Sequence, residues 1–338
     1  MKGEKEIHLL VLSPSPNGDG LSGNLRVASL NQKPSYVALS YAWEEPIRRS
    51  ESVWTFLGLY QFLRQCYWRY LQPGFVTIQL NGMNHKIHRN FASALFHLRR
   101  DDEPLCIWAD APCINQENSF EKKSQVGMMD LIYANAQKTY VWLGPKADNS
   151  DAAMDFVFSS SRLNMKDLEK VRGAAALAPF QALRALFASS WLSWIWTIQE
   201  ILLSRQAVVK CGDREVDFQR FVDLATTERA IVMAPPPGVD TSVQWIWIPR
   251  MPSFDIMTEW RKLPRSKNPL SFWMEHTTSF SFTLSRDRIY ALLKISKAHD
   301  RDAIMVDYSE KTSNAQIFKN LAVYFLQNEN DLKFLRCG

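Results

Sequence analysis

The chain has 338 residues, 46% of them hydrophobic and 22% charged, so it is long enough to bury a core as one large domain or two ordinary ones. Its net charge of +5 is a mild excess spread along the chain and gives no reason to expect nucleic-acid binding. No apolar run reaches the roughly 18 residues of a membrane span, and the start does not fit a signal peptide. The five cysteines form no CxxC pair, so we expect neither disulfides nor zinc, and a cytoplasmic location is the default.

The N-terminal part alternates strands and loops. An apolar run predicts a strand over Ile7–Leu12, and its Pro, Gly and Asn content predicts a loop over Ser13–Asn24. A second, continuous apolar run predicts a buried strand over Tyr36–Trp43. A helical and hairpin insertion follows at about residues 48–88, and Asn81-Gly82 supplies the turn of its hairpin.

The middle of the chain continues this alternation. The apolar spacing of Arg89–Arg100 predicts a helix, and Leu105–Asp110 is a further buried strand. A loop follows, then one helix over Phe120–Ala136 and a strand over Lys138–Gly144. Helices are predicted next over Ser150–Ser160, Phe180–Ser189 and from about Ser193, before a last strand over Gln206–Gly212.

This order predicts an α/β fold, with a parallel sheet flanked by helices. We expect residues 1–215 to form this core and residues 216–338 to form a mainly helical extension packed on it. The sequence stops just after a helix, so we expect it to be cut from a longer protein. Ligands of such sheets bind at the carboxyl ends of the strands, which here means the loops after Trp43 and Asp110 and the segment that leads to Glu200.

Glu200 is the lone acid of an almost wholly apolar stretch, "WLSWIWTIQEILL". A buried carboxylate is costly unless it is paired or hydrogen-bonded, and no basic residue lies at helical spacing from it. Glu200 is therefore exposed at a helix edge, paired with a distant Arg286 or Arg288, or directed into a pocket whose wall is Trp196. Beside an aromatic wall, a carboxylate suits sugar hydroxyls and an oxocarbenium-like transition state.

Three blocks of the sequence, "YVALSYAWEEP", "LCIWADAPCINQENSFEKKSQVGMMDLIYANAQKTYVWLG" and "WLSWIWTIQEI", resemble the fungal heterokaryon-incompatibility (HET) domain. Later segments, "SRDRIYALL" and "VDYSEKT", are similar to those that follow this domain in such proteins. The chain departs from the family pattern where Glu44 replaces a usual Gly, Lys122 a usual Arg and Trp194 a frequent Arg. The last change removes a charge close to Glu200.

The resemblance implies an effector of fungal non-self recognition and innate immunity that triggers programmed cell death. The HET domain is in turn similar to the Toll/interleukin-receptor (TIR) fold, which implies a flavodoxin-like sheet and cleavage of NAD or a related nucleotide, with no bound cofactor or metal. By position, Glu200 would be the catalytic carboxylate. The same resemblance, together with position at strand ends and loops, gives a set of ligand-binding candidates: Ser40, Tyr41, Trp43, Asp110, Asn115, Gln116 and Trp196.

Structural roles compete with most of these assignments. Asp110, Asn115 and Gln116 suit capping of their own loop, and Ser40 and Tyr41 suit packing at a strand end. The hairpin carries His85 and His88 but no third ligand, so we expect no metal site there.

Three functions remain open from the sequence. The first is the nucleotide hydrolase. The second is a signalling module without chemistry that forms a homo-oligomer or binds a partner protein, so that assembly causes toxicity. The third is a scaffold diverted to secondary metabolism, and the fold alone decides among none of them.

Overall fold

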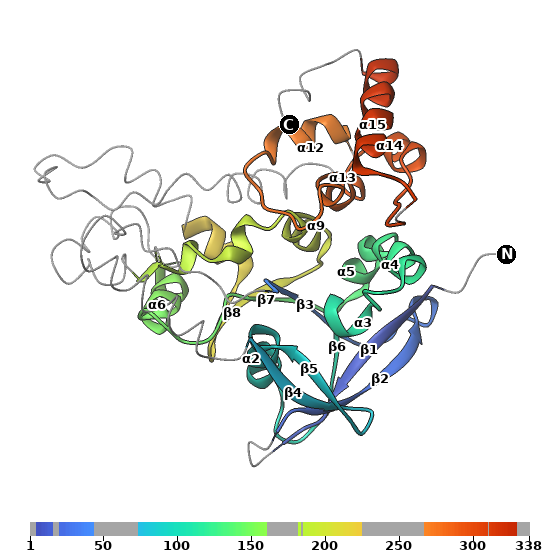
Figure 1. Cartoon of the computed structure of the whole chain (residues 1–338). Coiled ribbons are helices and arrows are strands. Elements are labelled where there is room, and N and C mark those ends of the chain that lie inside the picture. The colour runs from blue at the N-terminus through green and yellow to red at the C-terminus, as the bar shows by residue number, and fades with distance from the viewer. Residues whose placement is uncertain are drawn as a thin grey trace, which may run out of the picture.

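A computed structural model gives the fold of the chain (Figure 1). It describes residues 5–15, 20–43, 74–160, 182–183, 185–224, 267–309 and 311–329. Within these residues the strands form one nine-stranded mixed sheet, in the order β5-β4-β2-β1-β6-β3-β7-β8-β9. Helices lie on both of its faces (Figure 1), so the predicted α/β class is confirmed.

The centre of the sheet is parallel, as predicted. It contains β3 (Val37–Tyr41), β6 (Leu105–Trp108), β7 (Thr139–Trp142) and β8 (Ala207–Cys211), in the spatial order β6-β3-β7-β8. Counted along the chain, these strands stand second, first, third and fourth. Most of their residues are buried, as expected for parallel strands covered on both faces.

The prediction of a parallel sheet is wrong for the two flanks. On one side β1 (Glu6–Leu12) runs antiparallel to both β6 and β2 (Ser22–Ser29). A short parallel pairing joins β2 to β4 (Phe75–Leu80), which forms an antiparallel hairpin with β5 (Met83–His88). On the other side β9 (Arg214–Asp217) runs antiparallel to β8. Sequence analysis missed β2 and β9 because both are partly exposed and polar, and β2 takes in the end of the predicted loop.

The hairpin turn follows its sequence. Asn81 and Gly82 have φ of 52° and 75°, the positive values that a two-residue turn of this kind requires. Of the predicted insertion over residues 48–88, only the part from residue 74 lies within the described residues. Helix α2 (Arg89–Leu98) follows the hairpin and covers one face of the sheet with Phe91 and Leu95.

The opposite face carries α3 (Asp110–Cys113), α4 (Ser119–Val126), α5 (Met129–Asn135) and α9 (Trp196–Leu203). The single helix predicted over residues 120–136 is wrong, because the chain breaks between α4 and α5 at Gly127 and Met128. Glycine is a poor helix former, and the break turns α5 so that it packs against α9. A separate hydrophobic core lies under α6 (Ser150–Ser160), where strands β7, β8 and β9 meet residues 218–224.

The C-terminal helices are α12 (Leu270–His276), α13 (Asp287–Leu293), α14 (Ala298–Ala303) and α15 (Asn314–Asn328). In Figure 1 they lie beyond α9, and their buried residues join the same hydrophobic core as the outer side of α9. The main chain also connects the two parts: Ser281 donates to the carbonyl of Ser193 at 2.6 Å and accepts from the N–H of Ile195 at 3.0 Å.

Candidate functional site

Two carboxyl groups come together where the central strands end. Ser40 lies near the end of β3, Asp110 follows β6, and Glu200 lies on α9 above them. The Ser40 hydroxyl donates a hydrogen bond to Glu200 Oε2, and the Trp43 indole donates to Asp110 Oδ2 at 2.7 Å. The fold thus brings four of the predicted site residues to the edge of the sheet where α/β proteins bind ligands.

The alternation of β3 decides which side chains reach Glu200. Successive residues of a strand point to opposite faces, so Ser40 shares its face with Ala38, toward α9. Tyr41 points to the other face and stacks on Phe91 of α2, with ring centroids 5.1 Å apart. The two neighbouring candidates therefore lie on different faces of the sheet.

Glu200 is buried, with 8% of the residue exposed. Burial raises the pKa of its carboxyl to about 8, hydrogen bonds from Ser40 and Tyr133 oppose that rise, and the charge of Asp110 adds to it. Glu200 forms no salt bridge with any residue that the structure describes. At neutral pH the carboxyl is mainly protonated.

Arg286 is not the counter-ion of Glu200. Its guanidinium donates instead to the carbonyls of Asp307 at 3.0 Å, Ser309 at 3.3 Å and Thr312 at 3.3 Å. It therefore fastens the segment between α14 and α15. The sequence-based alternative of a Glu200–Arg286 ion pair is wrong because the arginine is fully used elsewhere.

Asp110 holds its position through several groups. It accepts from the Trp43 indole and, through Oδ1, from its neighbour's main-chain N–H at 2.8 Å. Burial raises the pKa of this carboxyl as well, although these hydrogen bonds lower it. The Tyr41 hydroxyl is buried near both acids, and burial together with the neighbouring Asp110 raises its pKa.

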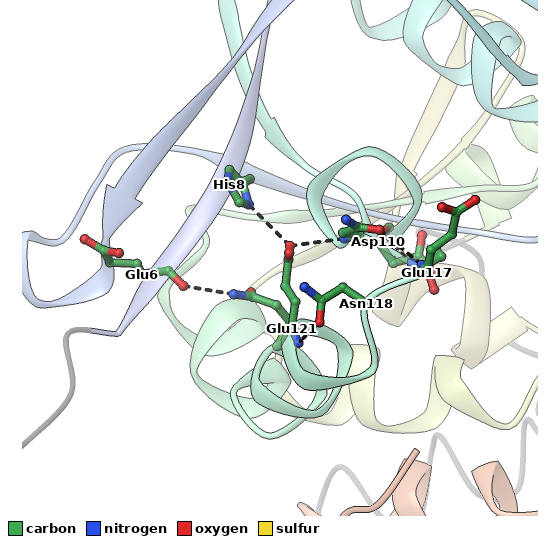
Figure 2. Close-up of polar contacts among 9 residues, drawn as sticks. Glu6, His8, Asp110, Glu117, Asn118 and Glu121 are labelled. Atoms are coloured by element: carbon green, nitrogen blue, oxygen red, sulfur yellow. Dashed lines mark hydrogen bonds and ion pairs between the residues drawn. The ribbon is translucent and has the colours of Figure 1, made fainter. Parts of the chain in front are cut away.

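The loop after Asp110 uses its polar side chains for its own structure (Figure 2). Gln116 donates to the carbonyl of Asp110 at 3.1 Å, and Asn115 accepts from the N–H of Glu117 at 3.1 Å. Glu121 accepts from the N–H of Asn115 at 3.1 Å, so the start of α4 is fastened back onto the loop. The positions of Asn115 and Gln116 thus support the capping role at least as well as ligand contact.

Trp196 is turned away from Glu200. It packs against the core shared with the C-terminal helices, and its indole N–H is directed at the buried Asp287 of α13. The aromatic residue beside the Glu200 cluster is instead Trp191, whose Nε1 donates to Ser40 Oγ at 2.7 Å. The i−4 spacing predicted Trp196, but spacing along one helix says nothing about what packs against it.

Sequence analysis missed Trp191 and Tyr133. Trp191 belongs to a 3-10 turn (Ser190–Ser193) that precedes α9, so no helical period connects it with Glu200. Tyr133 comes from α5, and its pattern indicates only a core-facing position. The single hint was that both residues carry a polar group on a ring in segments otherwise suited to full burial.

Other features lie apart from this cluster. A cavity of ≈ 660 Å³ lies between α12, α14 and α15 and is lined by residues that include Phe272, Lys297 and Tyr324. The described residues contain no group of three or more His, Cys, Asp or Glu side chains placed to hold a metal ion. Across the described helices, none has the length and apolar character needed to cross a membrane.

Residues 36–200 match the family model described as heterokaryon incompatibility protein (HET). The match begins just before β3 and ends on Glu200, so it contains the parallel strands β3, β6 and β7. It also contains the carboxyl cluster, by which we mean Ser40, Trp43, Asp110 and Glu200. Residues 36–200 are thus identified by this match as a HET domain.

Among curated proteins, the chain is 26% identical to heterokaryon incompatibility protein 6 (OR allele) of Neurospora crassa over 384 aligned residues. The alignment covers 98% of this chain and 54% of the relative, so the chain spans about half the length of that protein. No solved structure matches the chain.

Proposed function

We propose that the chain is an effector of heterokaryon incompatibility that acts in the cytoplasm and triggers cell death. We further propose that its carboxyl cluster does so by cleaving the N-glycosidic bond of NAD or a related nucleotide, as in TIR-type enzymes. The family match and the relative's name support the role in heterokaryon incompatibility. The proposed cleavage is supported by the geometry around Glu200.

The observation that carries the proposal is the pair of buried acids. Asp110 and Glu200 both have raised pKa values, and neither has a cationic partner within the described residues. A structural carboxylate in a protein core is normally paired, because an unpaired buried charge is strongly destabilising. Titratable groups that are perturbed by burial and by each other gather at functional sites.

The chemistry follows from the charge of Glu200. Departure of the base from a nucleotide leaves positive charge on the ribose, and an ionised carboxylate close to the ring stabilises it. Burial makes such a carboxylate more effective because water does not screen it. Trp43, held by Asp110, presents an aromatic ring beside the acids for stacking. Since Glu200 is 8% exposed, substrate entry requires the residues that cover it to move.

The test is release of nicotinamide from NAD by the purified chain, assayed at high protein concentration because TIR-type sites can be completed by assembly. We expect cleavage by the wild type, loss in Glu200→Gln, and no change in the exposed Glu117→Gln. The rate should rise as pH increases through about 8, because ionised Glu200 is the active form. Equal cleavage by wild type and Glu200→Gln would refute the catalytic assignment.

The burial of Glu200 favours a second candidate, a signalling module whose self-assembly or partner binding is toxic. A carboxyl that is protonated and hydrogen-bonded by Ser40 and Tyr133 also serves as a neutral part of the core. Expression in fungal cells separates the two functions. Under the hydrolase proposal Glu200→Gln abolishes killing, and under the assembly proposal it kills as the wild type does.

A further inference from the structure

A buried chain of hydrogen bonds ends on Glu200. The indole Nε1 of Trp191 donates to Ser40 Oγ at 2.7 Å, and the Ser40 hydroxyl donates to Glu200 Oε2. Trp191 is 0% exposed and Ser40 1%. Water therefore does not compete for these hydrogen bonds, and their direction is set by the protein alone.

That direction follows from the chemistry of the donors. An indole N–H can only donate, so Ser40 Oγ is the acceptor of the first hydrogen bond. A serine hydroxyl has a single proton and two acceptor lone pairs. The indole N–H takes one lone pair, and the structure directs the serine proton at Glu200 Oε2, which accepts it.

We propose that Trp191 is a positioning residue that acts through Ser40, favouring Oε2 of Glu200 as the acceptor of the serine proton and Oε1 as the oxygen that holds and releases the proton of the acid. Ser40 is then a support of Glu200 rather than a ligand contact. The inference rests on the proposed function only for the task of Oε1, which would be the oxygen that faces the reacting sugar.

Three further titratable groups face Glu200 from the surrounding elements. Tyr133 of α5 hydrogen-bonds to it, Asp110 of α3 opposes its ionisation by like charge, and Tyr41 of β3 lies within electrostatic range. None of them touches Trp191 through a hydrogen bond that the structure records. Removing the indole N–H therefore changes the direction of the Ser40 hydroxyl without removing any of these groups.

The test is Trp191→Phe, which keeps an aromatic ring and removes the donor. The Ser40 hydroxyl is then free to turn and accept the proton of Glu200, which stabilises the protonated acid. We expect the ionisation midpoint of Glu200 to rise by about one pH unit, the size of one hydrogen bond to a charged group. Infrared titration of the protonated carboxyl's C=O band measures this, with the band assigned by its loss in Glu200→Gln.

Ser40→Ala removes the hydroxyl that donates to Oε2 and should raise the midpoint in the same direction, so it can overturn the inference alone if Trp191→Phe does not fold. Trp142→Phe is the matched control, because Trp142 is a buried tryptophan whose Nε1 donates to Asn90 at 2.9 Å instead. Its Glu200 midpoint should stay at the wild-type value.

An unchanged midpoint in either Trp191→Phe or Ser40→Ala would overturn the inference. A shift of equal size in Trp142→Phe would do the same, since the effect would then come from loosened packing. The infrared readout needs no substrate. A shifted Glu200 midpoint without NAD cleavage leaves the inference standing and refutes the proposed hydrolase. Cleavage with unshifted midpoints refutes the inference and leaves the hydrolase standing.

Discussion

The residues around Glu200 shift the pKa of its carboxyl far from the ordinary value of a glutamate. Burial and the nearby Asp110 favour the protonated acid, and the donors Ser40 and Tyr133 favour the carboxylate. Burial prevails, so the pKa lies at about 8 instead of 4.5. The residue therefore titrates close to physiological pH, where a small change in its contacts changes its charge.

This shift predicts the pH dependence of stability. Between pH 4.5 and about 8 the folded chain keeps the Glu200 proton that the unfolded chain releases, so the group's contribution to stability is greatest at low pH and falls as pH rises. The neutral Glu200→Gln lacks this loss. Relative to that variant, wild type should lose on the order of 4 kcal/mol from low pH to pH 8, measured by urea unfolding.

Glu117→Gln, which changes an exposed glutamate, is the control and should show no such pH-dependent difference. If the free energy of unfolding of the wild type differed from that of Glu200→Gln by the same amount at low pH and at pH 8, the raised pKa would be contradicted.

Several candidate residues could be found from the sequence, and others could not. Glu200 is conspicuous as a lone acid in an apolar stretch, while Ser40, Trp43 and Asp110 stand at the ends of recognisable strands. Their mutual contacts depend on how α9 docks on the sheet. Local periodicity does not contain that information, so the partner Trp191 was out of reach.

At the scale of elements, one arginine orders the connection between α14 and α15. Arg286 donates to the main-chain carbonyls of Asp307, Ser309 and Thr312 and to the Asn314 side chain at 3.1 Å. In the same segment, the Tyr308 hydroxyl donates to Asp287 at 2.8 Å. The segment thus lies against α13 through polar contacts, and the planar guanidinium is the only donor type that reaches so many acceptors at once.

Arg286→Lys should therefore be far from conservative. The ammonium group of a lysine cannot form all of these hydrogen bonds at once, and we expect a loss of about 2 kcal/mol or more in the free energy of unfolding. Amide hydrogen exchange should increase first within residues 306–313. The exposed Arg205→Lys provides the comparison and should leave both quantities unchanged; equal exchange in the two variants would refute the role of Arg286.

The strongly apolar elements were predictable and the polar ones were not. Strands β3, β6, β7 and β8 follow continuous apolar runs, and the β4–β5 turn follows Asn81-Gly82. The strands β2 and β9 were missed because each leaves much of its surface to solvent, so their sequences look like loops. The α4–α5 break was missed because a single Gly127 within an apolar period is normally tolerated.

At the scale of the whole molecule, the C-terminal helices and the α/β part share a core. Phe325 of α15 is 0% exposed and belongs to the same cluster as Ile195 and Ile198 beside the sheet. A shared core of this kind predicts that the two parts unfold together, since neither can lose its apolar contacts without exposing those of the other.

Phe325→Ala should lower the free energy of unfolding by about 3–5 kcal/mol, because it opens a cavity in this core. Circular dichroism and tryptophan fluorescence should still report one coincident transition in urea. Val323→Ala on the same helix is the control, since Val323 is 44% exposed and should cost little. Two separate transitions in the Phe325 variant would show independent parts.

The main-chain bridge at Ser281 has a consequence for any rearrangement of α9. Ser281 bonds to Ser193 and Ile195, which stand between Trp191 and the start of that helix. A displacement of the loop between α12 and α13 must pull on these residues or rupture the bridge. Binding of another molecule to the C-terminal helices, if it moved Ser281, would therefore also displace the segment that carries Trp191.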